Sequence, residues 1–451
     1  MSSQTSSNLP EPATSRSDRR DTGVGSVFVS NYPPYAHWGK KHLPAAQQAL
    51  DQAPADAAAD LGLYLHIPFC RKRCKFCYFR VYTDKNSKQI LRYLDALARE
   101  VELYAARPAT QGRPLRFVYF GGGTPSYISA RHLRQLAARL QATMPWDQAE
   151  EVAFECEPGT LTQAKVAAIA EIGVTRLSLG LENMNDEILR ENGRAHTTRE
   201  IRAALPWVQA AGFQQVNVDL IAGMVGETWE LWRDTVQKTI DLDPDSVTVY
   251  QMELPFNTVY SKQVLGADDG PPPFADWQTK RDWHAYAFEQ FAAAGYQPSS
   301  AYTVMKKGTD ARFVYRDAVW QGADMLGCGV ASFSHMQGVH YQNDPSWDHY
   351  LESLEGGTLP LSRAYPTTPE ERLVREMILQ LKRGHLDAAY FRAKFGVELA
   401  DEFGAAYANL QEEGMLAFDR DQVRLTPQGL LMVDQLLPDF YDPRYRDGRY
   451  A

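Results

Sequence analysis

The sequence is poor in cysteine, in positive charge and in long apolar runs, and each shortage excludes a class of protein. Lysine and arginine number 47 against 56 aspartates and glutamates, and the net charge of −9 argues against general binding of nucleic acid or of an anionic membrane. No apolar run reaches the ~18 residues of a spanning helix. The first residues, MSSQTSSNLPEPATSRSDRRD, lack the apolar region of a secretory signal. We therefore expect a cytoplasmic protein with no integral membrane segment and no nucleic-acid partner.

The five cysteines are placed unevenly along the 451 residues. Cys70, Cys74 and Cys77 crowd together, while Cys156 and Cys328 stand alone and are interpreted as buried thiols. A secreted disulfide framework uses a larger, even number of cysteines spread along the chain. Thiolates at this spacing suit iron or zinc, and a structural zinc site needs a fourth ligand. We favour an iron–sulfur cluster with one iron left open to a small chelating molecule; zinc and an inert thiol cluster remain alternatives.

Composition divides the chain into five predicted parts. A polar tail (1–25) is expected to be disordered, and an aromatic, proline-containing extension (26–60) to pack on the main domain. A core of alternating strands and helices (61–265) follows. The next segment (266–366) is predicted to complete the barrel and to form the substrate region. The last part (367–451) is predicted to be mostly helical and winged-helix-like, without nucleic-acid contacts.

Short β-branched or aromatic runs alternate with helical periodicity about six times in the core. The predicted strands are 63–67, 117–120, 151–155, 175–180, 215–221 and 246–252, and the predicted helices are 87–106, 130–143, 161–172, 197–211 and 227–241. This alternation predicts an α/β fold with a parallel sheet and outer helices, as a full or partial barrel. Chemistry is expected at the carboxyl ends of the strands.

Several residues at these strand ends suit ligand binding. The glycines of 121–125 permit close backbone approach, and their N–H groups can meet a carboxylate. Glu155 can accept hydrogen bonds, Arg194 can form a bidentate pair, and Asp219, inside an apolar strand, must be paired or functional. A plain turn, a solvated strand end or simple packing is the alternative for each.

The motifs around these residues resemble one protein family. A CX3CXXC loop follows the first strand within YLHIPFC…C..CYF, and FGGGTPS, RLSLGLENMNDEILRENGRAH and NVDLIAGM come after it in order. Together they resemble the radical S-adenosylmethionine (SAM) superfamily, in the branch of oxygen-independent coproporphyrinogen III oxidases (HemN), HemW heme chaperones and class C methyltransferases. The resemblance runs from about residue 62 to 340 and includes the carboxyl-terminal part. It implies a partial (β/α)6 TIM-like barrel with a small carboxyl-terminal domain.

The resemblance also implies cofactors and residues that bind them. Cys70, Cys74 and Cys77 would ligate a [4Fe-4S] cluster whose open iron is chelated by SAM, and an electron from the cluster would cleave SAM to methionine and a 5′-deoxyadenosyl radical. The residues implied to contact SAM are Tyr64, Phe76, Gly122, Gly123, Thr124, Glu155, Glu182, Arg194 and Asp219. Glu182 departs from the pattern, because the coproporphyrinogen oxidases have glutamine there.

Three reactions are compatible with the family. The first is oxidative decarboxylation of propionate side chains on a tetrapyrrole, although Phe79 stands where the oxidases carry a further cysteine. The second is heme chaperoning, which shares Phe79 and a motif like YQMELPFNT (250–258), although 315–320 reads YRDAVW in place of HNXXYW. The third is methyl transfer from a second SAM to an unsaturated ring. His335 and His340 suit either heme binding or ordinary packing.

Basic side chains surround the cysteine loop. They form either a solvated loop or a surface that attracts an anionic substrate or an acidic electron donor such as flavodoxin or ferredoxin. These residues are Arg71, Lys72, Arg73, Lys75 and Arg80. The family resemblance implies a radical SAM enzyme, with a tetrapyrrole-like ring substrate and an electron donor as its partners.

Overall fold

Six parallel strands form the centre of one long sheet in the computed structural model of the chain, which describes residues 25, 28–56, 59–265 and 274–446. Most of the predicted tail lies outside these residues. The six strands are β1 (Leu61–Ile67), β2 (Leu115–Gly122), β3 (Glu151–Cys156), β4 (Arg176–Glu182), β5 (Gln215–Ala222) and β6 (Ser246–Gln251). Each pairs in parallel with the next, so the carboxyl ends of all six lie at one edge. The predicted partial barrel of six parallel strands is confirmed.

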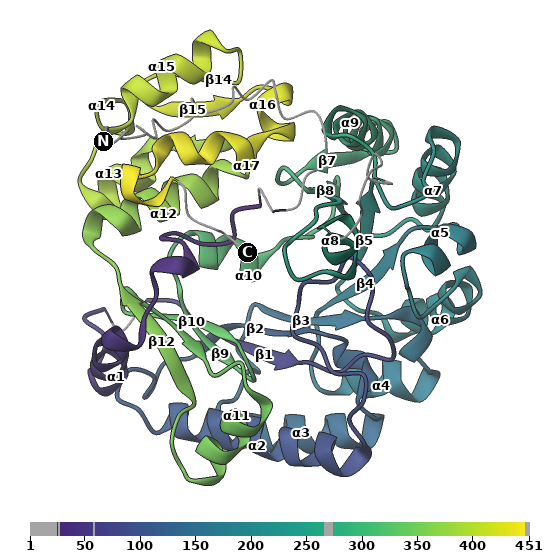
Figure 1. Ribbon diagram of the computed structural model, residues 1–451, viewed down its shortest axis with the longest axis vertical. Helices are drawn as coiled ribbons and strands as arrows, with labels where there is room; N and C mark the ends of the chain where they lie inside the picture. Colours follow the sequence, from purple (N-terminus) through teal and green to yellow (C-terminus); the bar gives the residue numbers. More distant parts are fainter. Residues whose placement is uncertain (1–24, 26–27, 57–58, 266–273, 447–451) are drawn as a thin grey trace, which may run out of the picture.

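Helices connect these strands and cover the outer side of the sheet (Figure 1). They are α2 (Ser87–Ala105), α3 (Ala130–Thr143), α4 (Gln163–Glu171), α5 (Asp186–Glu191), α6 (Thr198–Ala211) and α7 (Trp229–Asp241). Local sequence explains their ends: a capping box of Asn86 and Gln89 begins α2, and Gly212, with φ of 68°, ends α6. The short helix α5 was not predicted.

Further strands extend the sheet at both edges of the barrel. On the β1 side, β9 (Asp324–Cys328) is parallel to β1 and is followed by the antiparallel strands β10 (Phe333–Met336), β11 (Val339–Asn343) and β12 (Leu361–Pro366). On the β6 side lie the antiparallel strands β8 (Thr303–Lys306) and β7 (Tyr296–Pro298). Sequence periodicity missed these strands because they have only three to six residues.

The remaining helices flank the barrel or build the carboxyl-terminal domain. The first group is α1 (Leu43–Asp51), α8 (Val259–Leu265), α9 (Trp277–Ala293), α10 (Val314–Trp320) and α11 (Trp347–Glu355). The domain contains α12 (Pro369–Leu381), β13 (His385–Asp387), α13 (Ala388–Phe395), α14 (Leu399–Glu402), α15 (Gly404–Glu412), β14 (Leu416–Phe418), β15 (Gln422–Leu425), α16 (Pro427–Leu431) and α17 (Val433–Leu436). Its mostly helical character is confirmed, and β13, β15 and β14 form a small antiparallel sheet beside the helices. No helix among the described residues is both long and apolar enough to cross a membrane.

The amino-terminal segment 28–38 runs between the barrel and the carboxyl-terminal domain, where Figure 1 shows it in purple. Val29 and Tyr32 are buried in the core of the carboxyl-terminal domain. Trp38 stacks on His340 of β11, with ring centroids 5.1 Å apart. The segment thus packs on both parts of the molecule.

Candidate active site

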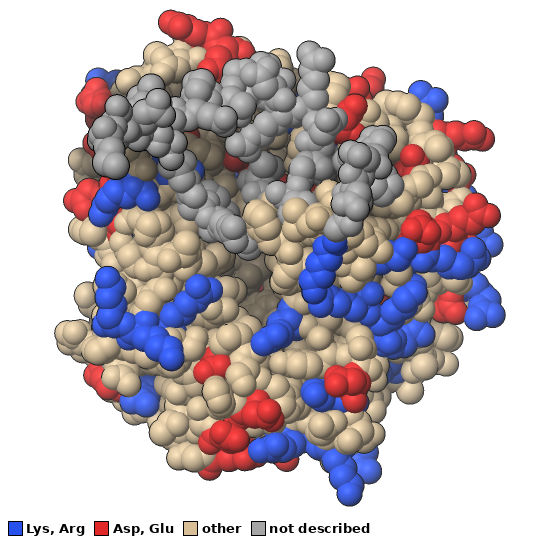
Figure 2. Space-filling model, in the orientation of Figure 1, with Lys and Arg blue, Asp and Glu red and all other residues tan. Residues whose placement is uncertain are grey.

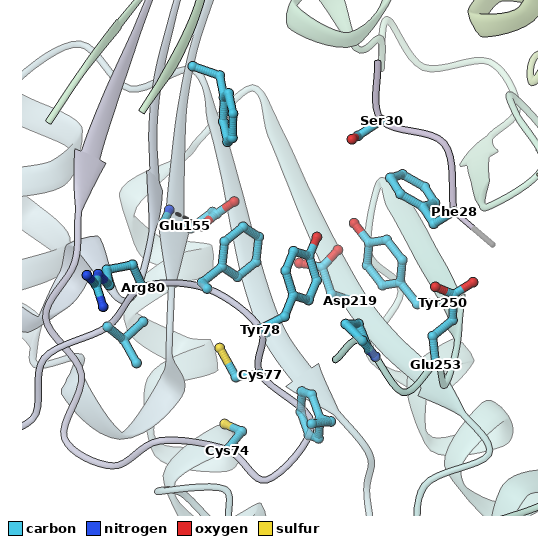
Figure 3. Close-up of a pocket in the computed structure, with 18 of the residues that line it drawn as sticks. Phe28, Ser30, Cys74, Cys77, Tyr78, Arg80, Glu155, Asp219, Tyr250 and Glu253 are labelled. Atoms are coloured by element: carbon cyan, nitrogen blue, oxygen red, sulfur yellow. Dashed lines mark hydrogen bonds between the residues drawn. The ribbon is translucent and has the colours of Figure 1, made fainter. Parts of the chain in front are cut away.

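A cavity of about 1340 Å³ lies at the carboxyl ends of the six parallel strands. Its walls come from the cysteine loop after β1, the strand ends, the amino-terminal segment, β10 and residues 430–435 of the carboxyl-terminal domain. Figure 2 shows a hollow near the middle of one face, with lysine and arginine side chains beside it. In Figure 3, Cys74 and Cys77 lie at one end of the pocket and Phe28 at the other, with Asp219 and Tyr250 between them. The predicted position of the chemistry agrees with this cavity.

Basic side chains fasten the cysteine loop to its surroundings. Arg71 donates two hydrogen bonds to Glu157, at 3.0 and 3.1 Å, and a third to the carbonyl of Ala195. Arg73 donates to the carbonyls of Cys77 and Asn257, each at 3.1 Å. Arg71 and Arg73 therefore hold the loop in shape, a role that neither of the two alternatives from the sequence included.

The sulfur atoms lie among hydrogen-bond donors. The Thr124 hydroxyl is 3.3 Å from the sulfur of Cys70, and Arg194 Nη1 is 3.4 Å from the sulfur of Cys74. Without a bound metal, burial raises the pKa of Cys70 to about 11 and that of Cys77 to about 12. A positively charged metal group would reverse this effect, because metal ligation favours the thiolate.

The geometry of the site fits an iron–sulfur cluster better than a single zinc ion. In the described part of the chain, no three His, Cys, Asp or Glu side chains converge closely enough to hold one metal ion. A zinc site needs such convergence, whereas cluster thiolates bind different irons. Buried nitrogens around the cavity also have no partner among the described residues, including Nε of Arg194 and Nε2 of His66. A polar ligand beside the cluster would satisfy them.

Three carboxylates face the cavity from neighbouring strands. They are Glu155 of β3, Glu182 of β4 and Asp219 of β5. Burial, and then repulsion by Glu182 and Glu155, raises the pKa of Asp219 to about 8. Burial likewise raises the pKa of both glutamates. A cationic ligand would stabilise the ionised form of these three carboxylates, because its positive charge relieves their mutual repulsion.

Glu182 and Arg194 meet at the end of β4. The backbone at Glu182 has a φ of 65°, which is rare for a residue with a side chain, and the β4–β5 register shifts there. Arg194 Nη1 lies 3.5 Å from Glu182, and its Nη2 donates to the carbonyl of Gly180 at 2.6 Å. Strained backbone of this kind is concentrated at functional sites. The contact of Arg194 with the Glu182 carboxylate is a single long one.

The glycine-rich turn does not offer free N–H groups, and this corrects the sequence-based expectation. The amide of Gly123 donates to Ile67, and that of Thr124 to Phe69, each at 2.9 Å. The amide of Gly122 donates to Glu155 at 3.2 Å. Gly122, with φ of 110°, is required because a Cβ there would lie 2.4 Å from the His66 ring. Gly122, Gly123 and Thr124 all line the cavity. The hydrogen bonds of the turn, however, connect the end of β2 to the segment that leads into the cysteine loop.

The two aromatic residues predicted near SAM both line the cavity. Tyr64 stacks on Tyr119, with centroids 5.8 Å apart, and Phe76 also packs on Ile188 and Met224. Sequence reasoning missed Tyr119, whose hydroxyl donates to Glu155 at 2.7 Å. The alternation of side chains between the two faces of β2 would have identified Tyr119, because Tyr119 lies two residues from Gly121 and therefore on the same face of the strand.

Glu157, unassigned from the sequence, joins the cysteine loop to the segment after α5. It contacts His196 at 2.9 Å as well as Arg71. Burial alone would raise its pKa, but hydrogen bonds from His196 and Arg71 outweigh burial and lower the pKa to about 2. The carboxylate is therefore ionised at neutral pH and anchors the loop.

Glu157→Gln is expected to lower the free energy of unfolding by about 2 kcal/mol, because it leaves Arg71 and His196 with a weaker, uncharged acceptor. Urea denaturation of cluster-free protein measures this change. The matched control is Glu191→Gln, which removes the Lys75–Glu191 pair on the same loop, whose side chains are 32% and 53% exposed. That exposed pair should contribute less than about 1 kcal/mol. Equal losses for the two variants would contradict the anchoring role of Glu157.

Comparisons with known proteins agree with this geometry. The model of the radical SAM superfamily matches residues 64–239, and the model of the HemN C-terminal domain matches residues 367–432. The chain is 26% identical to the oxygen-independent coproporphyrinogen III oxidase of Pseudomonas aeruginosa, over 88% of this chain and 89% of that protein. It is also 26% identical to the heme chaperone HemW of Bacillus subtilis, over 84% of this chain and 98% of that protein.

The fold of a solved relative is similar over nearly the whole chain. Coproporphyrinogen III oxidase (HemN) from Escherichia coli, a radical SAM enzyme, superimposes with a TM-score of 0.79 at 24% identity, covering 92% of this chain and 96% of that one. Residues 64–239 therefore match the radical SAM superfamily and residues 367–432 the HemN C-terminal domain, the chain as a whole is similar to oxygen-independent coproporphyrinogen III oxidases and to HemW, and its cofactors are a [4Fe-4S] cluster and S-adenosylmethionine.

Proposed function

We propose that this protein is a radical SAM enzyme that acts on a tetrapyrrole or related ring carrying acidic side chains. The observation that carries the proposal is a single cavity with three cysteines at one end and aromatic and unpaired cationic side chains elsewhere in its walls. Its volume of about 1340 Å³ exceeds the range typical of pockets for one small ligand. Such a cavity suits two ligands, a cofactor and a large substrate.

The end near the cysteines would hold the cofactors. Cys70, Cys74 and Cys77 would ligate the cluster, and the cluster supplies the electron that cleaves SAM. Glu155, Glu182 and Asp219 would surround the positive charge of SAM and accept hydrogen bonds from its amino and hydroxyl groups. Arg194, which reaches both Cys74 and Glu182, would pair with the carboxylate of SAM.

The remaining predicted contacts would complete the SAM pocket. Tyr64 and Phe76 would contact the adenosine part, since both expose ring surface to the cavity. Gly122 and Gly123 would pack closely against the ligand through their backbone, with carbonyl groups as acceptors because their N–H groups are already used. Thr124 would orient Cys70 through its hydroxyl.

Aromatic side chains exposed within the cavity favour a flat ring as the substrate. Tyr78 and Phe79 stack on each other with centroids 4.5 Å apart, and they are 40% and 44% exposed although they line the cavity. Tyr250, near the end of β6, also lines the cavity and is 43% exposed. Exposed aromatic rings gathered in one concave site are typical of ligand binding.

Two cavity arginines favour acidic groups on that ring. Arg375 is only 3% exposed, and Arg363 is partly buried. Arg375 donates to Asn31 and to the carbonyl of Val319, and Arg363 donates to Gln342 and to the carbonyl of Tyr35. Neither forms an ion pair within the described residues. A buried cation without an anion is unfavourable, and a substrate carboxylate would neutralise it.

Oxidative decarboxylation of propionate side chains is the first reaction to test, because those carboxylates suit Arg363 and Arg375. Methyl transfer to the ring is the second, since Phe79 supplies an aromatic surface in place of the oxidase cysteine. An acidic electron donor such as flavodoxin or ferredoxin would approach the basic side chains near the loop.

The test uses anaerobically reconstituted protein with SAM, dithionite and coproporphyrinogen III or heme, followed by mass spectrometry. 5′-Deoxyadenosine with loss of carbon dioxide from the porphyrinogen is the expected result. S-Adenosylhomocysteine with a methylated ring would instead establish the methyltransferase. Heme retained, with SAM cleaved and no new product, would establish a chaperone. Absence of both SAM cleavage and ring binding would overturn the proposal.

A further inference from the structure

The hydroxyl of Thr124 contacts a cysteine of the loop instead of capping its own turn. Thr124 precedes the short 3-10 helix Pro125–Tyr127, a position where threonine usually accepts a hydrogen bond from a following amide. Thr162 and Thr228 do so at the starts of α4 and α7. Among the described residues, the side chain of Thr124 accepts no such bond, and its Oγ1 lies 3.3 Å from the sulfur of Cys70. A side chain that normally serves helix capping is therefore directed at the cysteine loop.

The backbone holds this hydroxyl in place beside the sulfur. The amide of Thr124 donates to the carbonyl of Phe69 at 2.9 Å, and the amide of Tyr127 donates to the carbonyl of Thr124 at 2.8 Å. The residue is only 8% exposed, and a β-branched side chain has few rotamers. The consecutive residues Phe69 and Cys70 thus accept hydrogen bonds from the amide and from the hydroxyl of the same threonine.

Gly123 permits the close approach that this contact needs. A Cβ at Gly123 would lie 2.8 Å from the carbonyl carbon of Pro68 and 2.9 Å from the carbonyl oxygen of Ile67. The amide of Gly123 donates to that same oxygen of Ile67 at 2.9 Å. Because glycine has no Cβ, the end of β2 lies directly against residues 67–69, and the threonine that follows it reaches Cys70.

The other two cysteine sulfurs also have donors, but those donors cannot be removed alone. Arg194, 3.4 Å from the sulfur of Cys74, is also proposed to bind SAM, so its replacement would change two properties. The donor to Cys77 is the backbone amide of Phe79, which a side-chain substitution leaves in place. The hydroxyl of Thr124 is therefore the donor whose effect on a cluster ligand can be isolated.

A hydrogen bond to a cluster ligand changes the energy of the electron that the cluster accepts. A ligating thiolate carries no proton, so the threonine hydroxyl is the donor of this bond. Reduction adds one negative charge to the cluster, and a hydrogen bond to its sulfur stabilises the reduced form more than the oxidised form. The bond therefore raises the reduction potential, which favours electron transfer into the cluster.

We propose that Thr124 is a positioning residue that raises the reduction potential of the [4Fe-4S] cluster, through a hydrogen bond from its hydroxyl to the thiolate of Cys70. The inference rests on the proposed function for Cys70 as a cluster ligand, and it does not depend on the ring substrate. The alternative is that Thr124 contacts SAM, as the family resemblance implies. The two roles differ in whether the potential or the SAM affinity changes when the hydroxyl is removed.

The test is a redox titration of anaerobically reconstituted protein without SAM, in which electron paramagnetic resonance measures the reduced cluster at each potential. At the midpoint potential of the unaltered protein, the ratio of reduced to oxidised cluster is expected to fall at least about threefold in Thr124→Val, which replaces the hydroxyl by a methyl group. Thr124→Ser keeps the hydroxyl and should change this ratio less than about twofold. Thr110→Val is the matched control, because Thr110 is also buried and its hydroxyl donates to the carbonyl of Tyr104 just after α2. This control should behave like the unaltered protein.

An unchanged ratio in Thr124→Val would overturn the inference. An equal fall in Thr124→Ser would do the same, because the hydroxyl would then not be the cause. A loss of SAM affinity by calorimetry, with an unchanged ratio, would make Thr124 a SAM contact instead.

A variant that loses the cluster also gives an answer. If Thr124→Val does not retain it, Thr124→Ala serves, since it adds no atom near the sulfur, and the same fall is expected. If neither variant retains the cluster, Thr124 is needed to hold it, and the effect on the potential is overturned as its role. Product analysis on the unaltered protein tests the proposed function separately, because the redox titration contains no ring substrate.

Discussion

Replacement of Cys70, Cys74 or Cys77 by alanine, one at a time, is expected to abolish cluster binding and SAM cleavage. Each thiolate would hold a different iron, so the loss of one exposes a second iron and leaves a cluster that the protein does not retain. Thr124 and Arg194, which contact the sulfurs of Cys70 and Cys74, offer no replacement ligand. Iron and sulfide content after anaerobic reconstitution, and 5′-deoxyadenosine formed from SAM with dithionite, measure the two effects.

Cys328→Ala is the matched control for these variants. Cys328 is fully buried in the hydrophobic core and lies outside the cavity. Removing its sulfur should cost about 1 kcal/mol of unfolding free energy through the small void, while cluster content and SAM cleavage stay at the level of the unaltered protein. Full SAM cleavage by any one of the three loop variants would contradict the assignment of the cluster ligands.

Asp219→Asn is expected to remove most of the pH dependence of SAM binding and to weaken binding near pH 8. In the unaltered protein the pKa of Asp219 is about 8, so the carboxyl is protonated at pH 7. A cationic ligand stabilises the ionised form, so binding releases a proton and the affinity rises with pH up to about 8. The limit for one released proton is about tenfold per pH unit. Asparagine carries no such proton, so the affinity should be nearly flat between pH 6 and 7.5.

Calorimetry in buffers of different ionisation enthalpy measures the proton directly. About one proton should be released per SAM at pH 7 in the unaltered protein, and almost none in Asp219→Asn. Glu227→Gln is the matched control, because burial also raises the pKa of Glu227 to about 8 and its side chain does not line the cavity. Proton release that survives in Asp219→Asn, or disappears in Glu227→Gln, would exclude the proposed role of Asp219.

The raised pKa of Asp219 also has a consequence for stability. Because the folded protein binds this proton more tightly than the unfolded chain, the contribution of Asp219 to unfolding free energy falls as pH rises from about 4 to about 8. Asparagine should remove this fall, so the variant should tolerate mildly alkaline pH better than the unaltered protein. SAM binding and stability thus change in opposite directions in the same variant.

The sequence alone determined the barrel and the cysteine end of the cavity. Strands β1 to β6 were predicted within a few residues, because each has β-branched or aromatic residues and is separated from the next by a segment of helical periodicity. Parallel order then places the loop of Cys70, Cys74 and Cys77, together with Glu155 and Asp219, at one edge of the sheet. These features are local, and local spacing is what a single sequence contains.

Only the tertiary structure decided the rest of the cavity. Tyr32 packs on Tyr441, 409 residues later in the chain, and residues 430–435 form part of the cavity wall. The left-handed backbone of Glu182 and the pKa of Asp219 both depend on neighbours that come from other strands or from other parts of the chain. A sequence pattern does not specify such contacts, because chain closure over hundreds of residues is fixed by packing of the whole molecule and not by local spacing.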